Sequence, residues 1–195
     1  MAGIERKRPW YLVLSLLAAL AFGANGARSG WAMVMLYHEP IDPTTAGQGI
    51  ADEADRAAVV TRVEAYLHAV DAAKSLGWPL AVAKLLLGGS ALFFAMRAMA
   101  GSRGARAALV QLVLAQAAVA LASHWLLRDV DNAELRWIEA QQAAGHERVP
   151  DDVLRAAASV ALAIHVLGSG LIVLGLTRRR SRAFFEAAAA PVGER

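Results

Sequence analysis

The chain alternates between long apolar stretches and shorter charged ones. Charged residues are absent from residues 9–27, 107–127 and 156–177, and Lys84 is the single one within residues 75–96. Each stretch is about 19–22 residues long, enough at 1.5 Å per residue to cross roughly 30 Å of hydrocarbon. Whole turns are apolar all round, and backbone amides in lipid must be paired within the segment. The pattern therefore predicts membrane-spanning helices.

The predicted architecture is an all-α, integral membrane four-helix bundle with two short external helices capping its outer end. Residues 1–195 would form a single membrane domain. The expected spans cover about 9–35, 76–98, 107–127 and 154–177; the external segments are 38–75 and 128–153, and the cytoplasmic tail is 178–195.

The external segments carry weaker helical signals. An apolar face within residues 52–74 recurs at helical spacing and consists of Val59, Val63, Tyr66, Leu67 and Val70. We expect this helix either to lie on the outer surface or to stand up from it and continue into the second span through a kink at residues 77–79. Asp131, with Glu134 three residues later, resembles a capping box and predicts the start of the second external helix.

The distribution of charge predicts the orientation. Residues 1–9, the connection between the second and third spans, and the tail together hold 11 basic residues. The other two connections are acidic, with seven acids against three bases and seven against four. Basic residues gather on the cytoplasmic side, so we predict a multi-pass protein of the cell inner membrane with both termini in the cytoplasm. The basic tail is explained by lipid headgroups, and no nucleic-acid partner is implied.

The stretch Phe22–Trp31, FGANGARSGW, interrupts the first span with small and polar residues. It resembles a signal-peptide cleavage region, and cleavage would leave three spans. The apolar character resumes after it, and Gly26 and Gly30 form a GxxxG pattern that lets membrane helices approach closely. The sequence favours a retained long first helix over cleavage. Gly88, Ala91 and Gly168 are the expected packing positions on other spans.

Composition narrows the chemistry. The chain has no cysteine, which excludes disulfides, thiolate nucleophiles and zinc-thiolate sites. Three of the 20 basic residues are lysine, and together with heavy alanine use this points to a bacterial source. HExxH, GxSxG and P-loop motifs are missing, so the sequence leans against an enzyme.

Five polar residues in the spans are candidate ligand-binding residues: Lys84, His165, His124, Gln116 and Asn25. Ionisable residues inside a membrane usually face the protein interior and mark functional sites. The alternatives are a lysine that snorkels to the outer layer and polar residues that only join helices by hydrogen bonds. Haem is not expected, because His124 and His165 differ in depth by about 10 Å at helical rise. Glu64, His68 and Asp71 form a weak metal candidate, for which a solvated helix face is the ordinary explanation.

These features leave two functional hypotheses. The favoured one is a non-enzymatic accessory or assembly subunit that acts through helix–helix packing. Its expected partners are the lipid bilayer and either another membrane protein or a second copy of the chain. The alternative is a ligand-binding or transport protein whose outward-facing polar cavity, around Lys84 and His165, takes a small anion, a quinone or a lipid-like ligand. A lipid-modifying enzyme is a weaker third reading.

Overall fold

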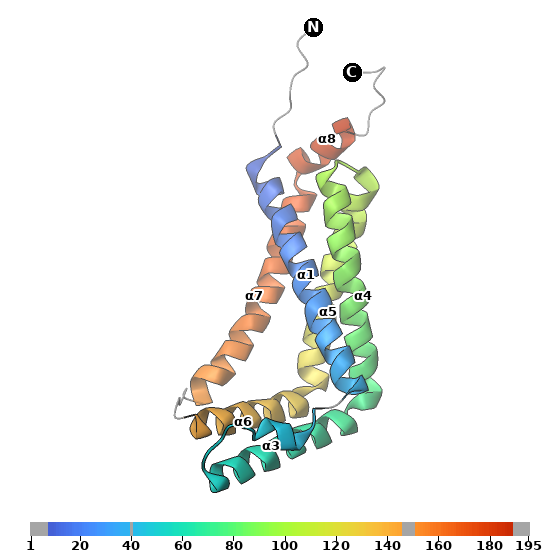
Figure 1. The fold of residues 1–195 in the computed structure, drawn as a ribbon. Helices are drawn as coiled ribbons and strands as arrows, with labels where there is room; N and C mark the ends of the chain where they lie inside the picture. The colour runs from blue at the N-terminus through green and yellow to red at the C-terminus, as the bar shows by residue number, and fades with distance from the viewer. Residues whose placement is uncertain (1–7, 40, 146–150, 189–195) are drawn as a thin grey trace. The chain divides into compact units, whose positions relative to one another are not determined.

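The computed structural model describes residues 8–39, 41–145 and 151–188, which contain helices and no strand (Figure 1). The helices are α1 (Trp10–His38), α2 (Pro43–Ala46), α3 (Glu53–Ala72), α4 (Lys74–Met99), α5 (Arg103–Leu126), α6 (Arg128–Ala144), α7 (Asp151–Thr177) and α8 (Arg179–Ala188). The all-α prediction is thus confirmed for the described residues. Arg6 and Lys7, residues 146–150 of the second external segment and residues 189–195 of the tail lie outside them.

Four helical segments are long and apolar enough to cross a membrane: Trp10–His38, Lys74–Met99, Gly104–Leu126 and Ser159–Thr177. They fall on the four stretches that the hydrophobic pattern selected. The first is one uninterrupted helix through the glycine-containing stretch 22–31, so these glycines do not end it.

Three local predictions were wrong or incomplete. One alternative had the external helix continuing unbroken to a kink at residues 77–79, but the helix is interrupted at Ala73, and Pro79 lies inside α4. The α6 helix begins at Arg128 after Leu127, which makes no side-chain cap, so Asp131 does not start it. Helices α2 and α8 were not predicted. Ala73 is the single non-helical residue between α3 and α4, and Leu127 is the single one between α5 and α6.

The chain divides into two compact units. The first contains residues 1–29, 84–118 and 164–195, and the second contains residues 30–83 and 119–163. The core of the first unit combines large side chains on α1, α5 and α7 with alanines on α4, and Phe185 of α8 completes it. Its fully buried members include Leu12, Leu16, Ala91, Ala95, Leu109, Val113, Ile172 and Leu176.

Helices α1 and α4 cross in this unit through glycine backbones. A Cβ atom on Gly23 would lie 2.8 Å from the backbone N of Leu92, and one on Gly88 would meet the backbone of Gly26 and Ala27. Contacts under 3.0 Å to backbone leave no room for any side chain. Gly26 and Gly88, two of the predicted packing positions, therefore join two helices of the same chain. Ala91, a third, is fully buried on α4.

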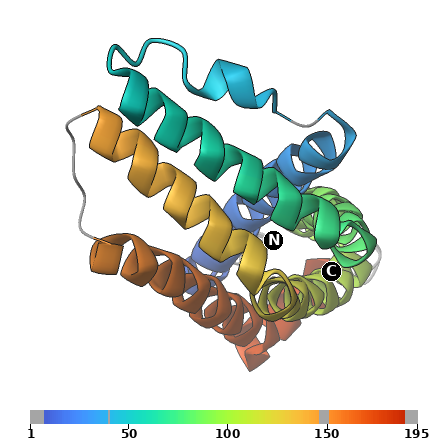
Figure 2. The ribbon, with the colours of Figure 1, turned by 90° about the horizontal axis from the view of Figure 1, so that it is seen from below.

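The second unit is built around the pair α3 and α6, which lie side by side and run in opposite directions (Figure 2). The α3 helix starts at Asp52, whose carboxylate accepts hydrogen bonds from the backbone N–H groups of Ala54 and Asp55 at 2.8 and 3.0 Å. Its predicted apolar face is confirmed, with these residues buried: Val59, Val63, Tyr66 and Val70. The Tyr66 and Trp137 rings stack at 5.4 Å between centroids.

We expect Glu134 of α6 to make the stability of the α3–α6 pair depend on pH. Desolvation raises the pKa of its carboxyl above the ordinary value, and the charge of Asp131 raises it further. The folded protein then binds the proton more tightly than the unfolded chain. The stabilisation is therefore present at low pH and is lost as pH rises through the folded-state pKa.

We expect Glu134→Gln to raise the free energy of unfolding at neutral pH by less than about 1 kcal/mol, because solvent screens the exposed side chain. The variant should also lose this part of the pH dependence. Denaturant unfolding between pH 4 and about 8 measures both effects. Glu64→Gln on the exposed face of α3 is the matched control and should follow the wild type. Equal profiles for the two variants would refute the assignment to Glu134.

Candidate functional site

Gln116 of α5 is a polar side chain held among apolar helices in the first unit. It is 6% exposed, and its Nε2 lies against Gly26, where a Cβ atom would come within 2.8 Å of it. Among the described residues neither its Nε2 nor its Oε1 has a hydrogen-bond partner. An unpaired amide costs about 1–3 kcal/mol when buried, so this residue is not explained by stability.

His165 and Ser169 add polar atoms from α7 in the same unit. The two residues are four apart and so lie on one helix face. Ser169 is 2% exposed, and neither its Oγ nor the buried Nε2 of His165 has a hydrogen-bond partner in the part of the chain that the structure describes. Lys84 of α4 belongs to the same unit. Helices α4, α5 and α7 of this unit thus carry the four polar residues Lys84, Gln116, His165 and Ser169.

Phe22 of α1 packs against His165 and Gly168 of α7. Its ring packs on the His165 ring with centroids 4.9 Å apart and a tilt of 33°. It also occupies the space beside Gly168, where a Cβ atom would lie 2.5 Å from the Phe22 Cζ. A side chain at position 168 would collide with the Phe22 ring, so this position requires glycine. Sequence reasoning did not select Phe22 or Ser169; the spacing of Ser169 from His165 was the available signal.

The other predicted residues lie elsewhere. The Asn25 side chain is exposed on α1. His124 belongs to the second unit, where its Nδ1 lies 3.9 Å from Oδ2 of Asp131 and both side chains are about half exposed. Gly30 is buried, also in the second unit. Lys84 and His165 thus belong to the first unit, where Gln116 is buried and Asn25 is exposed.

The weak metal candidate stays on an open surface. Glu64, His68 and Asp71 are all exposed on α3. Within residues 8–39, 41–145 and 151–188, no group of three or more His, Asp or Glu side chains is placed to hold a metal ion.

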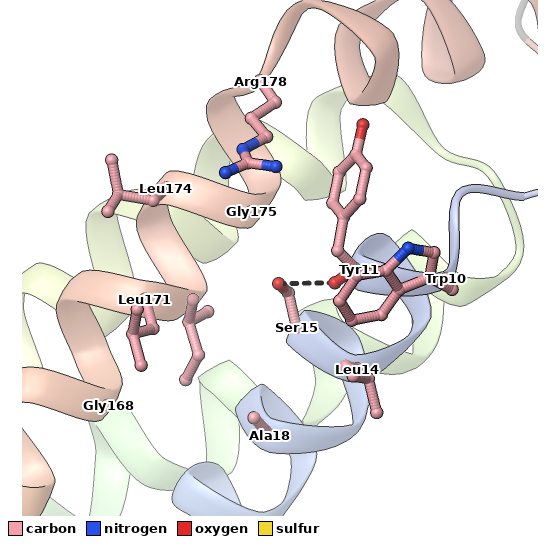
Figure 3. Close-up of a pocket in the computed structure, with 11 residues that line it drawn as sticks. Trp10, Tyr11, Leu14, Ser15, Ala18, Gly168, Leu171, Leu174, Gly175 and Arg178 are labelled. Carbon is pink, nitrogen blue, oxygen red and sulfur yellow. Dashed lines mark hydrogen bonds between the residues drawn. The ribbon is translucent and has the colours of Figure 1, made fainter.

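A groove in the first unit was not foreseen from the sequence. It has a volume of about 450 Å³ and lies between the first turns of α1 and the last turns of α7 (Figure 3). Its lining is apolar except for Ser15 and Arg178 and the ring edges of Trp10 and Tyr11. Ser15 donates its hydroxyl to the Tyr11 carbonyl at 2.8 Å, so this polar side chain is satisfied within its own helix. Gly175 lets α7 approach α1 at Ser15.

Comparison of the chain with protein-family models, curated proteins and solved structures finds no match. The functional argument therefore depends on the residues of the site alone.

Proposed function

We propose that this chain is a multi-pass protein of the bacterial inner membrane that binds a small ligand in its interior. Gln116, His165 and Ser169 would hydrogen-bond the ligand, and Lys84 would supply positive charge. The observation that carries the proposal is Gln116, which is 6% exposed and whose amide atoms have no hydrogen-bond partner among the described residues.

The chemistry of the site limits the ligand. Gln116 offers a donor and an acceptor, Ser169 offers a hydroxyl, and Lys84 favours negative charge or a polarised oxygen. A small anion, or the carbonyl end of an amphipathic molecule such as a quinone, meets these groups. Hydrocarbon alone would leave each polar atom unpaired.

The experiment is extraction of small molecules from the protein purified in mild detergent, followed by mass spectrometry. We expect a compound that accompanies the wild-type protein and is lost from Gln116→Met, which keeps the shape of the side chain and removes its polar atoms. Gln111→Met, an exposed position on the same helix, should retain it. The same extract from all three proteins would contradict the proposal.

A second candidate is an accessory or assembly role. It is supported by two glycines against which no described residue packs. A Cβ atom on Gly89 of α4 or Gly170 of α7 would meet no atom of the described residues within 4 Å. Exposed Leu86, Phe93, Leu167 and Leu171 flank them on the same helices. Gly26, Gly88 and Gly168, three of the predicted packing positions, contact other helices of their own unit. Light scattering in detergent that gives one copy, with no co-purifying protein, would exclude it.

A further inference from the structure

The groove between α1 and α7 combines an apolar wall with a charged end. Leu14 on α1, and Leu171 and Leu174 on α7, are each more than half exposed along it. Ala18 and Gly168, two small residues, also line the groove (Figure 3). A surface of this kind suits a flexible hydrocarbon chain.

Arg178 closes the apolar wall with a positive charge at the end of α7. Its guanidinium lies over the Tyr11 ring, 5.1 Å from the centroid, which holds the side chain beside the groove. Trp10, which is 73% exposed, lines the same end. Tryptophan and arginine are characteristic of the level where lipid headgroups meet hydrocarbon.

The surrounding charge is strongly positive. Several arginines are close in sequence to the residues at this end of the groove: Arg8, Arg179, Arg180 and Arg182. The one acidic residue within α8 is Glu186. The Arg8 guanidinium lies 5.5 Å from the Phe184 ring centroid. The α8 helix buries Ser181 and Phe185 and exposes its arginines, and Ser181 donates to the Gly175 carbonyl at 2.7 Å. This end of the unit is thus complementary to an anion.

We propose that the groove binds an anionic phospholipid, with one acyl chain along the leucines and the phosphate at Arg178. A free phosphate would leave the apolar wall unused, and a zwitterionic lipid would gain less from the surrounding arginines. The proposal requires the membrane location that the proposed function also assumes. It is independent of the interior ligand, because the residues proposed to bind that ligand do not line the groove; these are Lys84, Gln116, His165 and Ser169.

The test is native mass spectrometry of the full chain, purified in mild detergent and supplied with equal amounts of phosphatidylglycerol and phosphatidylcholine. The wild type should retain phosphatidylglycerol preferentially. Arg178→Gln should lower that preference about fivefold, the factor expected for one basic residue at a lipid surface. Arg180→Gln removes the same charge outside the groove and should have a smaller effect. Equal losses in the two variants would overturn the site, since net charge alone would then explain binding.

A second variant tests the apolar wall. Leu14 is 55% exposed, so Leu14→Trp can fill the groove without disturbing the core, and the melting temperature should stay that of the wild type. We expect it to lower phosphatidylglycerol retention although every arginine remains. Unchanged retention in Leu14→Trp, or displacement of the lipid by millimolar inorganic phosphate, would show that the acyl chain does not occupy the groove. Retention of both lipids in equal amounts by the wild type would also overturn the proposal.

Discussion

Replacing Gly88 by alanine should destabilise the protein by about 3 kcal/mol or more, the upper end for overpacking, because the added methyl group meets backbone. The methyl would meet the backbone of Gly26 and Ala27, at 2.7 Å from the Gly26 carbonyl carbon. Backbone cannot move aside as the end of a side chain can, so α1 and α4 must separate. Thermal unfolding in detergent, monitored by circular dichroism, measures the effect.

Gly89→Ala provides the matched control on the adjacent residue. A Cβ atom at Gly89 would meet no atom of the described residues within 4 Å. Alanine is preferred to glycine in a helix by about 0.5–1 kcal/mol, so this variant should be as stable as the wild type or more so. Equal melting temperatures for Gly88→Ala and Gly89→Ala would mean that the glycine crossing of α1 and α4 is wrong.

The second large effect is expected at Gln116, where stability and function should change in opposite directions. Gln116→Met removes two buried polar atoms that have no protein partner among the described residues. In ligand-free protein it should raise the free energy of unfolding by roughly 1–3 kcal/mol, the cost of an unsatisfied buried group. The same variant should lose the bound compound. Residues that serve a site at the expense of stability behave in this way.

Gln111→Met separates this effect from a general gain in hydrophobicity, because Gln111 is exposed on the same helix. It should leave both ligand retention and unfolding nearly unchanged. If Gln116→Met instead lowers stability, the amide contributes to the packing of the first unit, and the proposed ligand role fails.

The positions of the long helices could be predicted because they depend on composition. In a stretch that is apolar on every side, the backbone N–H and C=O groups have to hydrogen-bond to one another within the stretch, whatever surrounds it in the fold. The α3 face could also be predicted, since Val59, Val63, Tyr66 and Val70 repeat at helical spacing beside charged residues.

Helix ends were less predictable because packing decides them. The chain leaves the helix at Ala73 and Leu127, and neither residue type favours a break. Pro79 is accommodated inside α4 although proline removes a helical hydrogen bond. The α8 helix was obscured by its run of arginines; Ser181 and Phe185, four residues apart, were the signal of its buried face.

The site could be predicted only in part, because an all-round apolar helix does not reveal which face turns inward. Gln116 and Asn25 were selected on equal grounds, yet Gln116 is buried and Asn25 is exposed. Contacts with other helices set that rotation. The α1–α7 groove was not visible because its leucines resemble any lipid-facing leucine in sequence.

Cysteine accessibility tests the membrane arrangement most directly, since the chain has no cysteine of its own. Three single variants are sufficient: Thr61→Cys on α3, Ala100→Cys after α4, and Leu114→Cys within α5, where the side chain is 52% exposed. A membrane-impermeant maleimide should label Thr61→Cys in intact cells, and Ala100→Cys only after the membrane is permeabilised. Leu114→Cys should stay unlabelled in both conditions because lipid covers it. Rapid labelling of Leu114→Cys, or the reverse pattern at the other two positions, would contradict the account.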